Sequence, residues 1–465
     1  MCNLSGSRER ANRNITRSWE IETNGGRMPR ARGVGDVAIA GREPFGDAGW
    51  ERVWGTVTGT ANPDDGIVGL AAEHGWSSEF EVIGPPADAP HEAVLVDVEN
   101  RGGRSTYEMV APEVGRAQVA YARVQWQVEH TVGVPEHAQG VGLAILRDFG
   151  RWLATRFRVR VLAGASQSAW CVNTFIAEGF NRDPESGGPV YDGALAYLSG
   201  GNWLAINRWG DDGDPQSPYA RPNGVPVPAA ELLTRPDSDP FLVEISSYTD
   251  YYRLRASRSA TAPLPTRARH YDFPSPHAPG GVVSPDVVFD ALGCNGGQVV
   301  PMNPIGAGPS IRAALLGLFR EGGATTLADE VPALPPSVFF TLGPPPPASE
   351  HFNALPGVEL QVPLVDDDAQ PRGGVRFPDV ELPLGRAQPA ALAPCGTQSI
   401  ADVCGNFGGW QPFDPAELAR RYGTVDDYAA RYAERYDALV TQGFALMSER
   451  DRAIELARRA FSSAD

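Results

Sequence analysis

Short apolar runs along the chain alternate with stretches in which apolar residues recur at helical spacing. The run at 93–98 is typical of a buried strand, whereas 311–319 has the spacing of an amphipathic helix. Strands are predicted at 53–57, 78–82, 93–98, 121–128, 159–163, 193–198, 241–245 and 267–273, and helices at 135–155, 169–180 and 311–319. This alternation predicts an α/β fold with a mostly parallel central sheet flanked by helices on both faces.

Composition shifts divide the chain into three parts. We expect residues 1–44, which are polar and rich in arginine, to be disordered, and residues 45–322 to form the core, with an insertion at about 200–240. Residues 323–465 form a C-terminal extension that begins rich in proline and turn residues and ends in helices over 415–460. Because a structureless loop of that length is unusual in a compact domain, we expect the extension to wrap the core or to roof the site. Asp414 and Pro415 are expected to cap and start the terminal helices.

The most informative segment follows the strand predicted at 159–163. It has the sequence Gly-Ala-Ser-Gln-Ser at 164–168 and runs into a helical pattern. A strand, a sharp turn with small residues two positions either side of a serine, and then a helix are the features of a nucleophile elbow. The sequence therefore predicts Ser166 as an exposed nucleophile, with Gly164 and Ser168 as its small neighbours.

A serine nucleophile needs a histidine to take its proton and a carboxylate to orient that histidine. In an α/β hydrolase these groups follow the serine in the order acid, then histidine, on loops after late strands. We prefer His277, just past the strand at 267–273, to His270 inside it, although His277 could also be an ordinary surface histidine. Asp250, beyond the end of the strand at 241–245, is the expected acid; its alternative is a solvated aspartate that caps a helix.

The oxyanion of the tetrahedral intermediate requires two backbone N–H donors. The residue after the nucleophile, Gln167, is expected to supply one. The loop after the strand at 93–98 has the sequence Asn-Arg-Gly-Gly, and Arg101 or Gly102 is expected to supply the other. The alternative is that this loop is a plain Gly-Gly turn.

Charge and composition restrict the classes of binding partner and the cellular location that we expect. A net charge of −17 without a basic stripe argues against nucleic acid. No apolar stretch is long enough to span a membrane, so we expect no membrane partner. No secretory signal is visible, and we expect a cytoplasmic protein. Free thiols are favoured in such a protein, although Cys395 and Cys404 lie close enough in sequence to pair.

No cofactor or metal ion is expected. His130 and His137 lack the spacing of a helix-borne metal pair. The aspartates at 366–368 lack the surrounding glycine and glutamate of a calcium loop, and a solvated turn is the preferred interpretation.

Motifs scattered over the chain after about residue 45 resemble a specific group, the "alpha/beta hydrolase domain" proteins whose elbow has the sequence Gly-x-Ser-Gln-Ser-Gly. The matching segments are 55–59, 100–102, 164–168, 179–181, 191–193, 303–304, 362–378, 409–410 and 421–423. The resemblance implies an esterase-like hydrolase and an acid at Asp250, where the family has glutamate in a Glu-Tyr-Trp-like segment. Ala169 and Trp170 depart from the family's usual glycine and arginine.

The sequence therefore predicts a serine hydrolase that cleaves a small-molecule carboxylic ester through an acyl-enzyme intermediate. The alternative is an acyltransferase or biosynthetic tailoring enzyme with the same triad, since one fold hosts many chemistries. A non-catalytic binding protein is the weakest hypothesis, because all three triad residue types occur in the required order. The acyl and alcohol parts of the substrate and the oligomeric state stay open.

Overall fold

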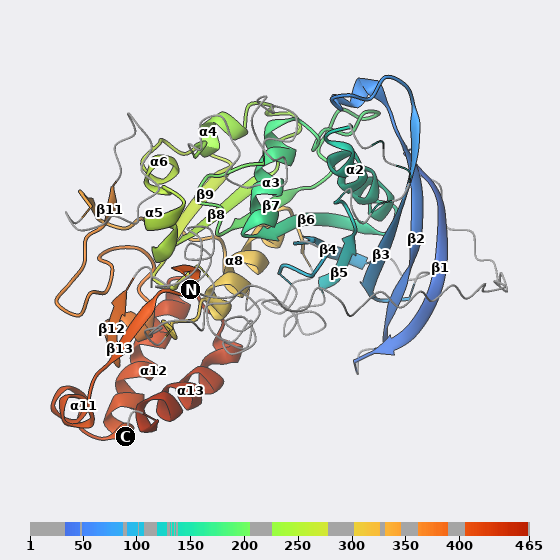
Figure 1. Ribbon diagram of the computed structural model, residues 1–465. Coiled ribbons are helices and arrows are strands. Elements are labelled where there is room, and N and C mark those ends of the chain that lie inside the picture. Colours follow the sequence, from blue (N-terminus) through green and yellow to red (C-terminus); the bar gives the residue numbers. More distant parts are fainter. Residues whose placement is uncertain are drawn as a thin grey trace, which may run out of the picture.

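The computed structural model describes residues 33–46, 49–86, 91–100, 102–106, 119–127, 131, 133, 135, 138–204, 226–277, 302–325, 331–345, 361–388 and 405–463 (Figure 1). Arg101, His130, His137, Cys395 and Cys404 lie outside the described residues, so the expectations for them stay untested.

A nine-stranded sheet runs through the centre of the molecule (Figure 1). Its strands are β1 (Val34–Phe45), β2 (Trp50–Ala61), β3 (His74–Gly84), β4 (His91–Val98), β5 (Val119–Val124), β6 (Phe157–Ala165), β7 (Gly193–Tyr197), β8 (Phe241–Ser247) and β9 (Ala268–Phe273). They lie in the order β1-β2-β3-β5-β4-β6-β7-β8-β9. The pairs β1-β2, β2-β3 and β3-β5 are antiparallel. The remaining neighbours in this order, from β5-β4 to β8-β9, are parallel.

Side chains of each parallel strand alternate between two separate cores. Val161 of β6 belongs to the core on one face, whereas Leu162 belongs to the core on the other. The helices α2 (Val141–Leu153), α3 (Gln167–Ala177) and α4 (Ala229–Leu232) cover the second face. The helix α8 (Gly308–Glu321) and the C-terminal segments cover the first. Burial on both faces explains why these strands are nearly continuous apolar runs in the sequence.

The expected fold class is confirmed, with shifts at element ends. The fifth strand ends at Val124 rather than at 128, and the following helix spans Val141–Leu153 rather than 135–155. The helix after the elbow begins at Gln167, directly after the serine, rather than at 169.

One expectation about the N-terminal segment was wrong. Residues 34–44, which we expected to be disordered, belong to the strand β1, which pairs with β2 along its length. Within β1 only Val34 is buried, because the strand lies at the edge of the sheet. A strand of this kind contributes few apolar residues, so its sequence resembles a polar linker. Residues 1–32 lie outside the described residues.

The Pro-rich extension attaches to the other edge of the sheet. Val338 accepts a hydrogen bond from Asp272 N and donates one to the carbonyl of His270, both at 3.0 Å, so it pairs alongside β9. Further on, the extension forms β10 (Leu342–Gly343), β11 (Val362–Pro363), α9 (Pro378–Glu381), β12 (Gly385–Gln388) and β13 (Gly409–Pro412). Its described parts therefore pack against the strand that leads to His277.

Helices complete the C-terminal part of the chain: α11 (Pro415–Tyr422), α12 (Val425–Thr441) and α13 (Arg450–Ser462). They lie beside α8, on the side of the sheet away from α2 and α3 (Figure 1). Asp414 is the N-cap of α11 and accepts a hydrogen bond from Glu417 N at 2.8 Å, which confirms the predicted start.

A buried polar cluster joins the last two strands to the extension. His270 of β9 lies between Glu244 of β8, at 3.3 Å from its Nδ1, and Asp272, at 2.8 Å from its Nε2. Burial alone would lower the pKa of His270, but the Asp272 and Glu244 carboxylates raise it to about 10. Asp272 also accepts hydrogen bonds from Tyr251 OH and Phe340 N, each at 2.7 Å. A buried imidazolium therefore holds two carboxylates and the extension together.

We expect His270→Gln to lower the free energy of unfolding by about 3–5 kcal/mol, because it leaves buried carboxylates without their cation. Urea unfolding at pH 7 measures this. The pKa of His270 lies above its ordinary value of 6.5, so its contribution is present below pH 6.5 and is lost as the pH rises toward about 10. The exposed His74 offers the control His74→Gln, which should leave stability unchanged. Equal stability of both variants would contradict the proposed charge on His270.

Candidate active site

Ser166 occupies a strained turn between β6 and α3. Its backbone has φ 59° and ψ −123°, a conformation that residues with a side chain seldom adopt. A Cβ atom at Gly164 would lie 2.5 Å from the carbonyl carbon and oxygen of Ser168, so only glycine fits there. Ser166 is the one residue between 161 and 176 that is not buried. The turn therefore presents its hydroxyl at the surface of an otherwise closed segment.

His277 and Asp250 converge on this serine. His277 Nε2 lies 3.0 Å from Ser166 Oγ, and His277 Nδ1 lies 2.5 Å from Asp250 Oδ1. With its proton on Nδ1, His277 donates to Asp250 and leaves Nε2 free to accept from the serine hydroxyl. Asp250 is fully buried, and His277 is 6% exposed. The three residues lie at the carboxyl ends of β8, β9 and β6, where ligands of open parallel sheets bind.

Asp250 is buried rather than solvated, so the alternative of a solvated capping aspartate is wrong, but its carboxylate does take part in a helix cap from the N3 position. Ser247 is the N-cap of α5 (Tyr248–Arg253), and its Oγ accepts from Asp250 N at 3.2 Å. In return, Asp250 Oδ2 accepts from Ser247 N at 2.7 Å. Tyr248 N donates to the carbonyl of Ser275 at 3.1 Å, which fixes the histidine loop against the same helix. One carboxylate thus orients the imidazole and is itself oriented by a capping box.

The loop after β4 contacts the nucleophile elbow directly. Asn100 Nδ2 donates to the carbonyl of Ala165 at 3.3 Å, and Ala165 N donates to Ser105 Oγ at 3.3 Å. Gly102 has φ 79°, and its N–H donates to Gln127 Oε1 at 3.1 Å. The Gly102 N–H already has an acceptor in Gln127, which weighs against Gly102 as the second donor to the oxyanion. Arg101, the other candidate, lies outside the described residues.

A buried carboxylate shapes the same loop from within. Asp97, at the end of β4, accepts hydrogen bonds from Ser105 Oγ at 2.8 Å and from Tyr121 OH at 2.9 Å. It also accepts from the backbone N–H of Ser105 at 3.0 Å and from Thr106 Oγ1 at 2.9 Å. Burial raises the pKa of Asp97, against these hydrogen bonds, which lower it. Ser105 thus connects Asp97 to the backbone of the elbow.

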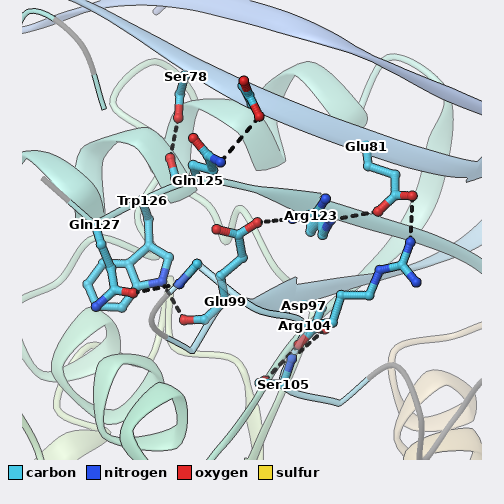
Figure 2. Close-up of polar contacts among 12 residues, drawn as sticks. Ser78, Glu81, Asp97, Glu99, Arg104, Ser105, Arg123, Gln125, Trp126 and Gln127 are labelled. Carbon is cyan, nitrogen blue, oxygen red and sulfur yellow. Dashed lines mark hydrogen bonds and ion pairs between the residues drawn. The ribbon is translucent and has the colours of Figure 1, made fainter. Parts of the chain in front are cut away.

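Next to Asp97, a row of alternating charges supports the start of the loop (Figure 2). Arg123 of β5 binds both Glu81 and Glu99, and Trp126 Nε1 donates to the carbonyl of Glu99 at 2.8 Å. Burial raises the pKa of Glu99 to about 7, although Arg123 opposes this rise. Glu81 is buried too, but its arginine partners hold its pKa below the ordinary value. Glu99 therefore changes charge near neutral pH, directly before Asn100.

The structure brings together Ser166, Asp250 and His277, the three residues that the sequence predicts, and Gln167 follows the serine directly. Gln167 is the first residue of α3, and the first N–H groups of a helix have no intrahelical acceptor. Asp97 and Ser105, which support the elbow, were not among the predicted site residues. The only signal was an aspartate within an otherwise apolar strand, a position that requires buried donors.

The two departures from the family pattern are accommodated within the core. Ala169 is fully buried, and Trp170 is 4% exposed. Trp170 Nε1 donates to the carbonyl of Ser199 at 3.0 Å, beyond the end of β7. Packing and this hydrogen bond thus hold Trp170 between α3 and the segment after β7.

Sheet order, elbow and site together define the α/β hydrolase fold. The chain belongs to the alpha/beta hydrolase domain family, whose model matches residues 118–455. A search of curated proteins found no match.

Among solved structures, similar proteins include an S-formylglutathione hydrolase from Staphylococcus aureus, at 11% identity over 48% of this chain and 92% of that chain, with a TM-score of 0.26. A glucuronoyl esterase from Teredinibacter turnerae is 14% identical over 54% of this chain and 76% of its own, with a TM-score of 0.32. A lid-less α/β serine hydrolase from Xanthomonas campestris is 14% identical over 47% and 85%, with a TM-score of 0.26. The substrates named for these proteins carry no argument for this chain at such low similarity.

The described residues contain neither a membrane-spanning helix nor a cluster of metal-ligating side chains. No helix in this part of the chain has the length and apolar character needed to cross a membrane. No group of three or more histidine, cysteine, aspartate or glutamate side chains in the same residues could hold a metal ion.

Replacing Glu99 by glutamine should change how stability depends on pH. The folded pKa of about 7 lies above the ordinary 4.5, so the folded protein holds the extra proton between these values and loses stability as the pH rises through them. At about 1.4 kcal/mol per pKa unit, we expect wild-type stability to fall by up to about 3 kcal/mol relative to Glu99→Gln. Urea unfolding from pH 4.5 to 8 measures the difference.

The control for this experiment is Glu73→Gln, which removes an exposed carboxylate just before the neighbouring strand β3. Its stability should stay parallel to that of the wild type across the pH range. Parallel curves for Glu99→Gln as well would contradict the raised pKa of Glu99.

Proposed function

We propose that this protein is a serine hydrolase that cleaves a carboxylic ester through an acyl-enzyme intermediate. The observation that carries the proposal is the continuous arrangement of Ser166 Oγ, His277 and the buried Asp250, at 3.0 and 2.5 Å. Family membership supports hydrolysis in general. A serine made nucleophilic by a histidine attacks acyl carbons, and an ester has a better leaving group than an amide.

In the first half of the reaction Ser166 Oγ attacks the acyl carbon while its proton passes to His277 Nε2. The carbonyl oxygen becomes an oxyanion in the tetrahedral intermediate. When this collapses, the bond to the alcohol oxygen breaks, and His277 returns the proton to the leaving alkoxide. The products of this half are the free alcohol and an ester between the acyl group and Ser166.

In the second half a water molecule attacks the acyl-enzyme and gives its proton to His277 Nε2. Collapse of the second tetrahedral intermediate breaks the bond to Ser166 Oγ, which takes the proton back from His277. The carboxylic acid leaves, so ester and water have become acid and alcohol. Asp250 stabilises the imidazolium in both halves through Nδ1–H without taking the proton itself.

Two N–H groups are proposed for the oxyanion hole. Gln167 N, at the start of α3, carries the positive end of the helix dipole in addition to its proton. Arg101 N is the second candidate from the sequence, and Gly102 N is not retained because it donates to Gln127. Ser105 and Asn100 bond the backbone of Ala165, so they are positioning residues for the turn that carries Ser166 and Gln167.

A fluorophosphonate probe should label the wild-type protein at Ser166 and fail to label Ser166→Ala. The matched control is Ser168→Ala, two residues further on. Ser168 is fully buried, and its hydroxyl has no partner among the described residues, so its loss should leave labelling intact. Gel fluorescence and peptide mass spectrometry measure the result. Equal labelling of Ser166→Ala and wild type would refute the nucleophile assignment.

Asp250→Asn and His277→Gln should each lower kcat for p-nitrophenyl esters by about 10³–10⁴-fold, because the first leaves the histidine without its orienting carboxylate and the second leaves Ser166 without its proton acceptor. KM should change little. Because Asp250 also caps α5, the melting temperature of each variant has to be measured, and Asp250→Glu tests whether the carboxylate alone restores activity. Activity of a folded His277→Gln within tenfold of wild type would contradict the proposed mechanism.

A further inference from the structure

A cavity lies outside the site described above. Its volume is about 460 Å³, and residues of α8, α9, β13, α12 and α13 line it. None of Ser166, Asp250 and His277 lines it. In Figure 1 this region is the red C-terminal layer beside the yellow helix α8. A cavity of this size is large enough for a small organic molecule.

Aromatic rings form much of the cavity wall. Trp410 of β13 and Tyr428, Tyr432 and Tyr436 of α12 all line it. The hydroxyls of Tyr428 and Tyr436 donate to backbone carbonyls at 3.3 and 3.2 Å, and that of Tyr432 donates to a carboxylate. Since these hydroxyls are already engaged, the tyrosines offer a ligand mainly their ring carbons.

One carboxylate in this wall has no cationic partner among the described residues. Asp379 of α9 accepts a hydrogen bond from Tyr432 OH at 3.1 Å. By contrast Glu381, two residues along on the same helix, is exposed and pairs with Arg376 and Arg435. Burial raises the pKa of Asp379, which is the response of a carboxylate that lacks a nearby positive charge.

The other charged groups of the wall are balanced or at its edge. Glu449 and Arg312 form an ion pair with each other. Arg452 on α13 is exposed, and so is Leu456, one helical turn further on, at 54%. The cavity therefore opens to solvent along α13 and contains a single unneutralised carboxylate inside.

We propose that this cavity binds a small organic cation with an apolar body. The cationic group would lie near Asp379, where it neutralises the carboxylate. The rings of Trp410 and the tyrosines would attract the same charge through their negative faces, and the apolar body would pack against them. This ligand site is independent of the esterase reaction proposed for Ser166.

The test compares two probes of equal shape, phenyltrimethylammonium and its neutral isostere tert-butylbenzene, by isothermal titration calorimetry on the full-length protein. Phenylacetate serves as an anionic probe. We expect the ammonium probe to bind at least tenfold more tightly than either of the others. Asp379→Asn should remove this preference, whereas Glu381→Gln on the same helix should keep it.

Three outcomes would overturn the proposal: tert-butylbenzene binding as well as the cation, phenylacetate binding better, or Asp379→Asn retaining the preference. The wild-type comparison decides the first two even if Asp379→Asn fails to fold. In that case photolabelling with 4-azidophenyltrimethylammonium locates the site. Labelled peptides from α9, α12 or β13 would support the cavity, and labels elsewhere alone would contradict it.

Discussion

The carboxylate of Asp250 is the interaction on which the arrangement of the site depends. One oxygen accepts from Ser247 N and completes the cap of α5, while the other faces His277 Nδ1 at 2.5 Å. The helix start therefore holds the carboxylate in place independently of the histidine. Because Asp250 is fully buried, water does not compete for either oxygen. A charge-assisted hydrogen bond in such surroundings is stronger than one at the surface.

The strain at Ser166 requires support from the rest of the sheet. A positive φ at a serine costs on the order of 1–3 kcal/mol, which the surrounding contacts must offset. Ser166 N donates to the carbonyl of Tyr197 on β7 at 2.9 Å, and Asn100 and Ser105 hold Ala165 from the other side. The elbow is thus clamped between the strands on both sides of β6. Contacts from the loop after β4, from β6 and from β7 together, and not the turn alone, hold the Ser166 hydroxyl in its strained position.

Much of this site could be predicted from sequence because the carboxyl ends of parallel strands meet at one edge. Once the strands before Ser166, Asp250 and His277 were recognised, their order along the chain implied their proximity. The edge strand β1 was missed because it buries almost nothing, and its polar residues resemble a linker. The cluster around His270 was missed for another reason. A buried charge is specified by partners from distant segments, here the extension at Phe340, and periodicity does not reveal them.

The central claim is that Ser166 forms a covalent acyl intermediate during turnover. Acid quenching of the enzyme within its first turnovers of a slowly deacylated p-nitrophenyl ester, followed by digestion and mass spectrometry, tests it directly. We expect a peptide that carries Ser166 and the added mass of the acyl group, together with a burst of p-nitrophenol equal to the enzyme concentration. Turnover with no burst and with an unmodified Ser166 peptide would contradict it.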